Sequence, residues 1–113
     1  MNETRVKIKE ISKSAAYERL VNWYGAGLLS NHAMADLAEL IAAVSRMKSG
    51  SFDYEQLVEK LAAASYSIDI LKEIYNIDEN DVNSWKEFTL KRGLEKIAAA
   101  EDRERFWHKH STK

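Results

Sequence analysis

The chain has 113 residues, enough for one compact domain with its own core but too few for two independent ones. Its 17 Lys and Arg nearly balance 18 Asp and Glu, and the net charge of −1 argues against both a general nucleic-acid binder and an acidic disordered chain. The absence of cysteine excludes disulfides, thiolate zinc sites and cysteine nucleophiles. We therefore expect a single domain over 1–113, with a core of about 12–98 and mobile ends, in the cytoplasm and without a membrane segment.

A first helix is predicted near the N-terminus, in a chain whose lack of proline and only four glycines leave few points at which helices can end. The stretch SKSAAYERLVNWYGAG combines two candidate N-caps, Ser12 and Ser14, with Gly25 and Gly27 as residues that end the helix. No segment shows the alternation of apolar and polar residues that is typical of a strand, so the expected fold class is all-α.

A second helix is predicted over 30–48, ahead of Gly50. It carries an apolar stripe at helical spacing, and Leu40 and Met47 lie to one side of that stripe. A domain of this size has difficulty burying two faces of one helix, so we expect Leu40 or Met47 at the interface of a homodimer or tetramer. The stripe consists of Met34, Leu37, Ala38, Ile41, Val44 and Ser45.

A third helix is predicted to begin after the N-cap Asp53, because Gln56 follows three residues later in the order of a capping box. A fourth helix is entered through Asp78; it has no single apolar stripe, and Gly93 is a candidate for a bend. The third helix has the most regular stripe in the chain, and we expect it to form the core. That stripe consists of Leu57, Leu61, Ala64, Ile68, Leu71 and Tyr75.

Two carboxylates, Asp36 and Glu39, stand one turn apart on the second predicted helix, within the phrase DLAELIAAVSRM. His32 lies within roughly 60° of both around the helix axis. Taken alone, such a pair of acids is most often solvated or paired with a basic neighbour such as Arg46.

Together with a third helix that closes on LKEIYNID and a further long helix, this phrase resembles the MazG-like all-α nucleoside triphosphate pyrophosphohydrolases, over about residues 15–98. The resemblance implies a four-helix MazG-like bundle, completed by oligomerisation, in which an E-x-x-E and an E-x-x-D on successive helices hold Mg²⁺. It makes Asp36 and Glu39 the remaining metal ligands. Mg²⁺ prefers oxygen ligands, and carboxylates one turn apart can share it while substrate phosphates complete its coordination.

The same resemblance places Lys60 and Ala63 where the family has its second pair of acids. Asp36, Glu39 and Lys60 together carry a formal charge of −1, so we expect any Mg²⁺ to be held weakly. Lys60 is a candidate for contact with a phosphate or, equally, a solvated flank residue, and His32 is a weaker candidate for substrate binding. No residue is assigned as catalytic.

Three functions remain open at this point. The leading hypothesis is a divergent MazG-like protein with an impaired magnesium site that binds a nucleotide or another protein. One alternative is an active Mg²⁺-dependent enzyme that splits an NTP or dNTP into nucleoside monophosphate and pyrophosphate, with Glu55, Glu59 or Asp69 as replacement ligands. These three acids point away from Lys60 around the helix, which favours the first hypothesis. A structural oligomer without a ligand is the other alternative.

Overall fold

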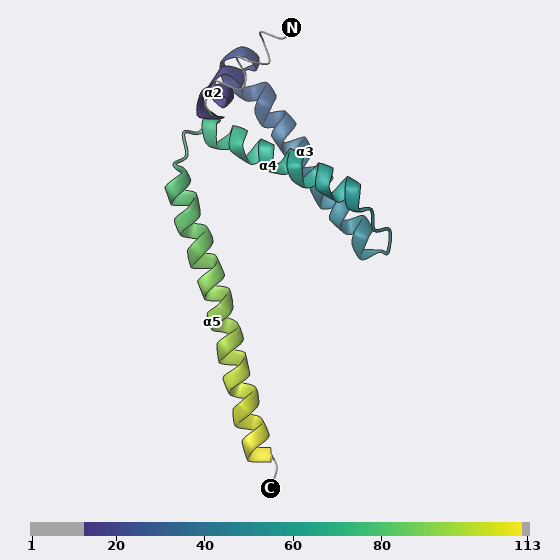
Figure 1. Ribbon diagram of the computed structural model, residues 1–113, viewed down its shortest axis with the longest axis vertical. Helices are drawn as coiled ribbons and strands as arrows, with labels where there is room; N and C mark the ends of the chain where they lie inside the picture. Colours follow the sequence, from purple (N-terminus) through teal and green to yellow (C-terminus); the bar gives the residue numbers. More distant parts are fainter. Residues whose placement is uncertain (1–12, 112–113) are drawn as a thin grey trace. The chain divides into compact units, whose positions relative to one another are not determined.

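The computed structural model describes residues 13–111, and every regular element in that range is an α-helix (Figure 1). The all-α class is therefore confirmed for the described residues. One compact unit ends at Ile77 and a second begins at Asp78. The helices are α2 (Lys13–Tyr24), α3 (Ala26–Lys48), α4 (Tyr54–Ile74) and α5 (Glu79–Ser111).

The joint between α2 and α3 is a single residue, Gly25, with φ of 89°. A side chain at this φ is strained, because only glycine adopts it freely. The N–H of Gly25 donates to the carbonyl of Val21 at 2.9 Å, and the N–H of Leu29 donates to the carbonyl of Gly25 at 3.2 Å, so Gly25 takes part in a backbone hydrogen bond of each helix.

The predicted limits of the first two helices need correction. Gly27 does not end a helix but lies in the first turn of α3, which begins four residues earlier than expected. Gly25 alone makes the turn. Gly27 follows in the first turn of α3, where a glycine costs little helix stability. Of the two N-cap candidates, Ser14 lies inside α2 and Ser12 lies outside the described residues.

The starts of α4 and α5 agree with the sequence. The Asp53 side chain accepts a hydrogen bond from the N–H of Gln56 at 3.1 Å, which confirms it as the N-cap of α4. The Asp78 side chain accepts from the N–H of Asn80 at 2.8 Å at the start of α5. The candidate bend at Gly93 does not interrupt α5, which runs as one helix to its end.

Helices α3 and α4 form an antiparallel hairpin (Figure 1). Its direction follows from three side-chain contacts whose order reverses between the helices: Arg46 to Gln56, Glu39 to Lys60, and Asp36 to Ser67. The buried residues are three, four or ten positions apart, spacings that keep them on one face of each helix, and most are small, which allows the two helices to approach closely. They are Leu29, Ala33 and Ala43 on α3, and Ala64, Ser67 and Ile70 on α4.

This seam corrects one prediction about packing, and it adds an observation to a second, the oligomer interface, which stays a prediction. The stripe on α4 was expected to be core, yet Leu61, Ile68 and Tyr75 are exposed. Leu40 and Met47 were expected at an oligomer interface, yet they are half-buried and share the face of Ala33 and Ala43 that packs on α4. The seam is made largely of small residues, so several large apolar residues of α4 stay outside it, whereas Leu40 and Met47 lie beside it.

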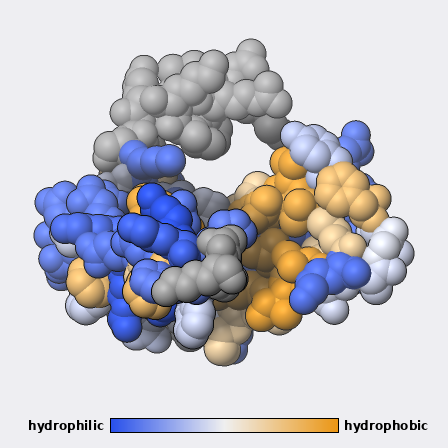
Figure 2. Space-filling view, turned by 90° about the horizontal axis from the view of Figure 1, so that it is seen from below, coloured by the Kyte–Doolittle hydropathy of each residue, from blue (hydrophilic) through white to orange (hydrophobic). Residues whose placement is uncertain are grey.

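Those large residues share one side of the hairpin. The contacts from Arg46 and Glu39 occupy one flank of the seam, and helical spacing puts the large apolar residues of both helices on the opposite flank. Figure 2 shows hydrophobic residues gathered on the hairpin. We call this surface the open apolar face; its exposed members are Met34, Ile41 and Val44 on α3, and Val58, Leu61 and Ile68 on α4.

Candidate functional site

Asp36 and Glu39 lie on the flank of α3 that is turned towards α4. Their spacing of three residues keeps both carboxylates on this side, one turn apart. Asp36 is half-buried, whereas the Glu39 side chain keeps 56% of its surface exposed. The two acids therefore differ in their surroundings, and each has its own partner on α4.

The partner of Glu39 is Lys60. The Lys60 ammonium donates a hydrogen bond to Oε2 of Glu39 at 2.7 Å, and this bond raises the pKa of Lys60. A second carboxylate, that of Glu59, lies 4.0 Å from the same ammonium. Only 22% of the Lys60 side chain is exposed, so its charge is held between two acids instead of extending into solvent.

The partner of Asp36 is Ser67, which the sequence did not single out. The Ser67 hydroxyl donates to Oδ2 of Asp36 at 2.7 Å, and Ser67 is 2% exposed. A signal for this contact existed in the spacing: Ser67 follows Lys60 by seven residues, which is two helical turns on the same face of α4. A serine between Tyr66 and Ile68 adds no charge to the pattern, however, so spacing alone does not distinguish it.

The residues present do not fit a Mg²⁺ ion. Such an ion requires close to six oxygen ligands in an octahedron. Asp36 and Glu39 are the two acids on this flank of α3, Glu39 is paired with an ammonium, and the positions facing them hold Lys60 and Ala63. Within residues 13–111, no group of three or more His, Cys, Asp or Glu side chains is arranged to hold a metal ion.

Asp69, one of the suggested replacement ligands, is engaged elsewhere. Its carboxylate accepts hydrogen bonds from Tyr17 of α2 at 2.9 Å and lies 3.0 Å from the ammonium of Lys72. The bond from Lys72 lowers the pKa of Asp69, and the bond from Tyr17 acts in the same direction. Burial raises the pKa of the Tyr17 hydroxyl, and its bond to Asp69 raises it further. This cluster ties α2 to α4.

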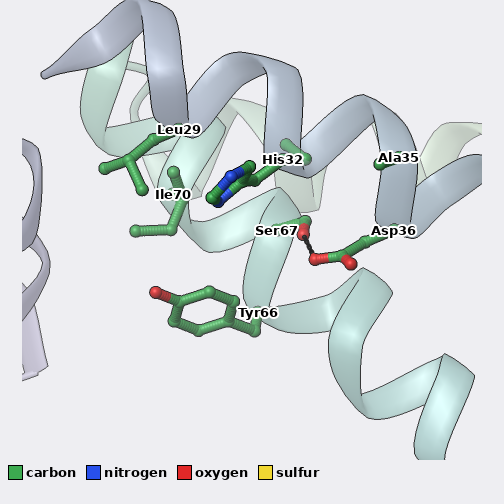
Figure 3. A pocket seen from close by; sticks show the side chains of 8 residues that line it. Leu29, His32, Ala35, Asp36, Tyr66, Ser67 and Ile70 are labelled. Atoms are coloured by element: carbon green, nitrogen blue, oxygen red, sulfur yellow. Dashed lines mark hydrogen bonds between the residues drawn. The ribbon is translucent and has the colours of Figure 1, made fainter. Parts of the chain in front are cut away.

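A pocket of about 190 Å³ opens between α3 and α4 beside Asp36. Figure 3 shows His32 and Asp36 projecting from α3 towards Ser67 and Ile70 of α4, with the ring of Tyr66 below them. His32, proposed from the sequence as a weak binding candidate, therefore shares a pocket with Asp36. Lys60 and Glu39 are not among its walls. The lining residues are Leu29, His32, Ala33, Ala35, Asp36, Tyr66, Ser67 and Ile70.

None of the helices in the described part of the chain has an apolar stretch long enough to cross a bilayer. Comparison of the chain with protein-family models, with curated proteins and with solved structures found no match.

Proposed function

We propose that this chain is a divergent MazG-like protein that has lost the ability to hold Mg²⁺ and acts by binding protein, not by hydrolysing nucleotides. The observation that carries the proposal is the 2.7 Å contact between the Lys60 ammonium and Glu39. In the resemblance on which the proposal rests, Lys60 stands where the family has an acid, so an ion pair occupies the space that would belong to a metal ion and its ligands.

The ion pair also argues against Lys60 as a phosphate-binding residue. A phosphate would have to displace a carboxylate that already neutralises the ammonium at hydrogen-bond distance. The open apolar face, by contrast, has no partner among the described residues, and monomeric soluble proteins rarely expose continuous apolar patches of more than a few hundred Å². Protein binding is therefore favoured over nucleotide binding.

The proposed partner is a second copy of the chain. The members of the open apolar face are uncharged, and the charged residues that share their helical spacing, Lys48 and Lys72, stand near the C-terminal ends of α3 and α4. Two such faces can therefore meet around a two-fold axis with these charges at the rim of the contact. Two hairpins packed in this way make four helices around a common core, which is the arrangement of a four-helix bundle. A homodimer is the smallest assembly that covers the face, and a tetramer is two such dimers.

Two measurements test the impaired metal site. The first is pyrophosphate release from a panel of NTPs and dNTPs with Mg²⁺ or Mn²⁺, for which we expect no turnover above background because two carboxylates, one of them neutralised, cannot organise the metal. Robust turnover that disappears in Asp36→Ala or Glu39→Ala would overturn the proposal and establish the active enzyme instead.

The second measurement asks whether the site can be restored. Calorimetric titration with Mn²⁺ should show binding by the double variant Lys60→Glu with Ala63→Asp, and none by the wild type, because two acids are added opposite Asp36 and Glu39. The control variant, Ala62→Asp with Ser65→Glu, adds acids to exposed positions of α4 and should not bind. Equal, negligible binding by all three folded proteins would reject the remnant site.

A further inference from the structure

The pocket beside Asp36 plays no part in the proposed function, but its lining residues point to a ligand. Its inner walls are small or apolar, and both Ala33 and Ser67 are 2% exposed. Its polar groups are His32, Asp36 and the hydroxyl of Ser67, and the Tyr66 ring supplies an aromatic face (Figure 3). A volume of about 190 Å³ is below that of a typical pocket for a drug-sized ligand, so the pocket suits a single small group.

The charge of the pocket selects against anions. Among the lining residues, Asp36 is the only acid, and none is Lys or Arg. A phosphate would face this carboxylate without a compensating cation, and a lone carboxylate is also too few ligands for Mg²⁺. A group that carries positive charge and hydrogen-bond donors is the complementary ligand.

Asp36 is prepared to accept such a group. Its Oδ2 accepts the hydroxyl of Ser67 at 2.7 Å, which fixes the orientation of the carboxylate. Its Oδ1 accepts no hydrogen bond from any residue between 13 and 111. Because the carboxylate is half-buried, a charge-assisted hydrogen bond to the unused oxygen is stronger than it would be at a fully solvated site.

Tyr66 completes the complementarity. Its ring lines the pocket, and the ring of Tyr17 packs against it with centroids 6.0 Å apart and planes tilted by 51°. This contact limits the motion of a ring that is otherwise 42% exposed. A flat, weakly hydrated cation both stacks on an aromatic face and donates a fork of N–H groups to a carboxylate, and guanidinium has these properties to a greater degree than ammonium.

We propose that the pocket between Asp36 and Tyr66 binds a guanidinium group. The group belongs either to an arginine side chain of a protein or to a free small guanidine compound, and the chemistry of recognition is the same for both. The inference is independent of the proposed function, since it uses neither the MazG-like resemblance nor the open apolar face.

The test is a titration of the ¹⁵N-labelled chain, followed by amide chemical shifts. The ligands are methylguanidine, the blocked tripeptide acetyl-Gly-Arg-Gly-amide, methylammonium and inorganic phosphate. We expect saturable shifts that centre on residues 29–36 and 66–70 with both guanidinium ligands, weaker shifts with methylammonium and none with phosphate. Tighter binding of the peptide identifies an arginine side chain as the source, and equal binding identifies a free guanidine compound.

Variants decide whether Asp36 and Tyr66 make the site. Asp36→Asn keeps the shape and the acceptor for Ser67 but removes the charge, and should weaken guanidinium binding by about tenfold or more. Tyr66→Leu should also weaken it, and serves as a second variant if Asp36→Asn fails to fold. Glu18→Gln, a change at an exposed carboxylate of α2, should leave binding unchanged. Unchanged affinity in a folded Asp36→Asn, or absence of saturable binding in the wild type, would overturn the inference.

Discussion

Asp69 holds two helices together through two different donors. Tyr17 reaches it from α2, and Lys72 reaches it from the next turn of α4. Both donors favour the charged form of the carboxylate and so lower the pKa of Asp69; the bond from Lys72 has the larger effect. The Asp69 side chain is 27% exposed, so water screens this cluster only in part.

The lowered pKa of Asp69 predicts a loss of stability in acid. In the unfolded chain this carboxyl has its ordinary pKa of 3.8, and in the folded chain the pKa is lower. The stabilisation is therefore complete above pH 3.8 and is lost as the pH falls through the folded-state pKa. Asp69→Asn should reduce the free energy of unfolding near neutral pH by on the order of 1 kcal/mol, and the difference from wild type should shrink on acidification.

Urea unfolding of both proteins at a series of pH values measures this difference. Glu18→Gln, at an exposed position of α2, is the matched control and should follow the wild-type curve. A difference between wild type and Asp69→Asn that stays constant down to the lowest pH would show that the charge of Asp69 has no part in holding α2 to α4.

The candidate site shows which of its features a sequence can reveal. Asp36 and Glu39 are recognisable from their spacing within a helical phrase, and Lys60 from its place relative to LKEIYNID. The contact of Asp36 with Ser67 is not recognisable, because it depends on the rotation of α4 about its axis, which local propensity does not determine. The same is true of the pairing of Lys60 with Glu39, which the sequence left open between phosphate contact and solvation.

The seam between α3 and α4 consists largely of small side chains. Ala43 is fully buried, and Ala64 is 3% exposed. Close approach of the two helices brings backbone and Cβ atoms into contact, so dispersion forces act over a short distance without large side chains between them. Such a seam has no room for added methylene groups.

Enlarging one seam alanine should therefore destabilise the hairpin. We expect Ala43→Leu to lower the free energy of unfolding by about 1–3 kcal/mol, because overpacking forces the helices apart. The matched control is Ala42→Leu, one residue away on the exposed side of α3, where the same change should have little effect. Urea unfolding monitored by circular dichroism compares the two. Similar values for both variants would contradict the close seam.

Helix limits were more accessible to sequence reasoning than packing was. The N-cap at Asp53 depends on a hydrogen bond to Gln56, three residues later. The turn at Gly25 depends on the backbone conformation of that one residue. Both features are local, so a short stretch of sequence is enough to suggest them. The choice of packing face is not local. Ile41 and Leu61 stand out in the hydropathy pattern, yet both are exposed, and the seam between α3 and α4 is made largely of small residues. An apolar stripe shows which side of a helix favours burial, but it does not show which element buries it.

The open apolar face gathers exposed apolar residues from both helices of the hairpin. Ile41, at its centre on α3, is 71% exposed, and burial of a side chain of this size contributes roughly 1.5–3 kcal/mol. Several such residues on one copy, doubled by symmetry, supply the driving force expected of a homodimer. We therefore expect the open apolar face to be the surface through which two copies associate.

A charge on the open apolar face should separate the copies. We expect the wild type to sediment as a dimer or tetramer at micromolar concentration, and Ile41→Glu to sediment as a monomer with unchanged helix content, because a buried unpaired carboxylate opposes association. Ala42→Glu, at an exposed position on the flank of α3 that carries Glu39 and Arg46, lies outside this face and should retain the wild-type state. A monomeric wild type, or an Ile41→Glu variant that stays associated, would show that a second copy does not cover the face.

The ion pair of Lys60 with Glu39 bears on whether the hairpin depends on divalent cations in solution. A cluster of carboxylates must recruit a counter-ion from solution, and its electrostatic repulsion returns whenever that ion is diluted or chelated. Lys60 is a counter-ion joined to the chain by covalent bonds, 2.7 Å from its acid, so its local concentration is fixed by the fold. We therefore expect this part of the hairpin to need no divalent cation as a counter-ion.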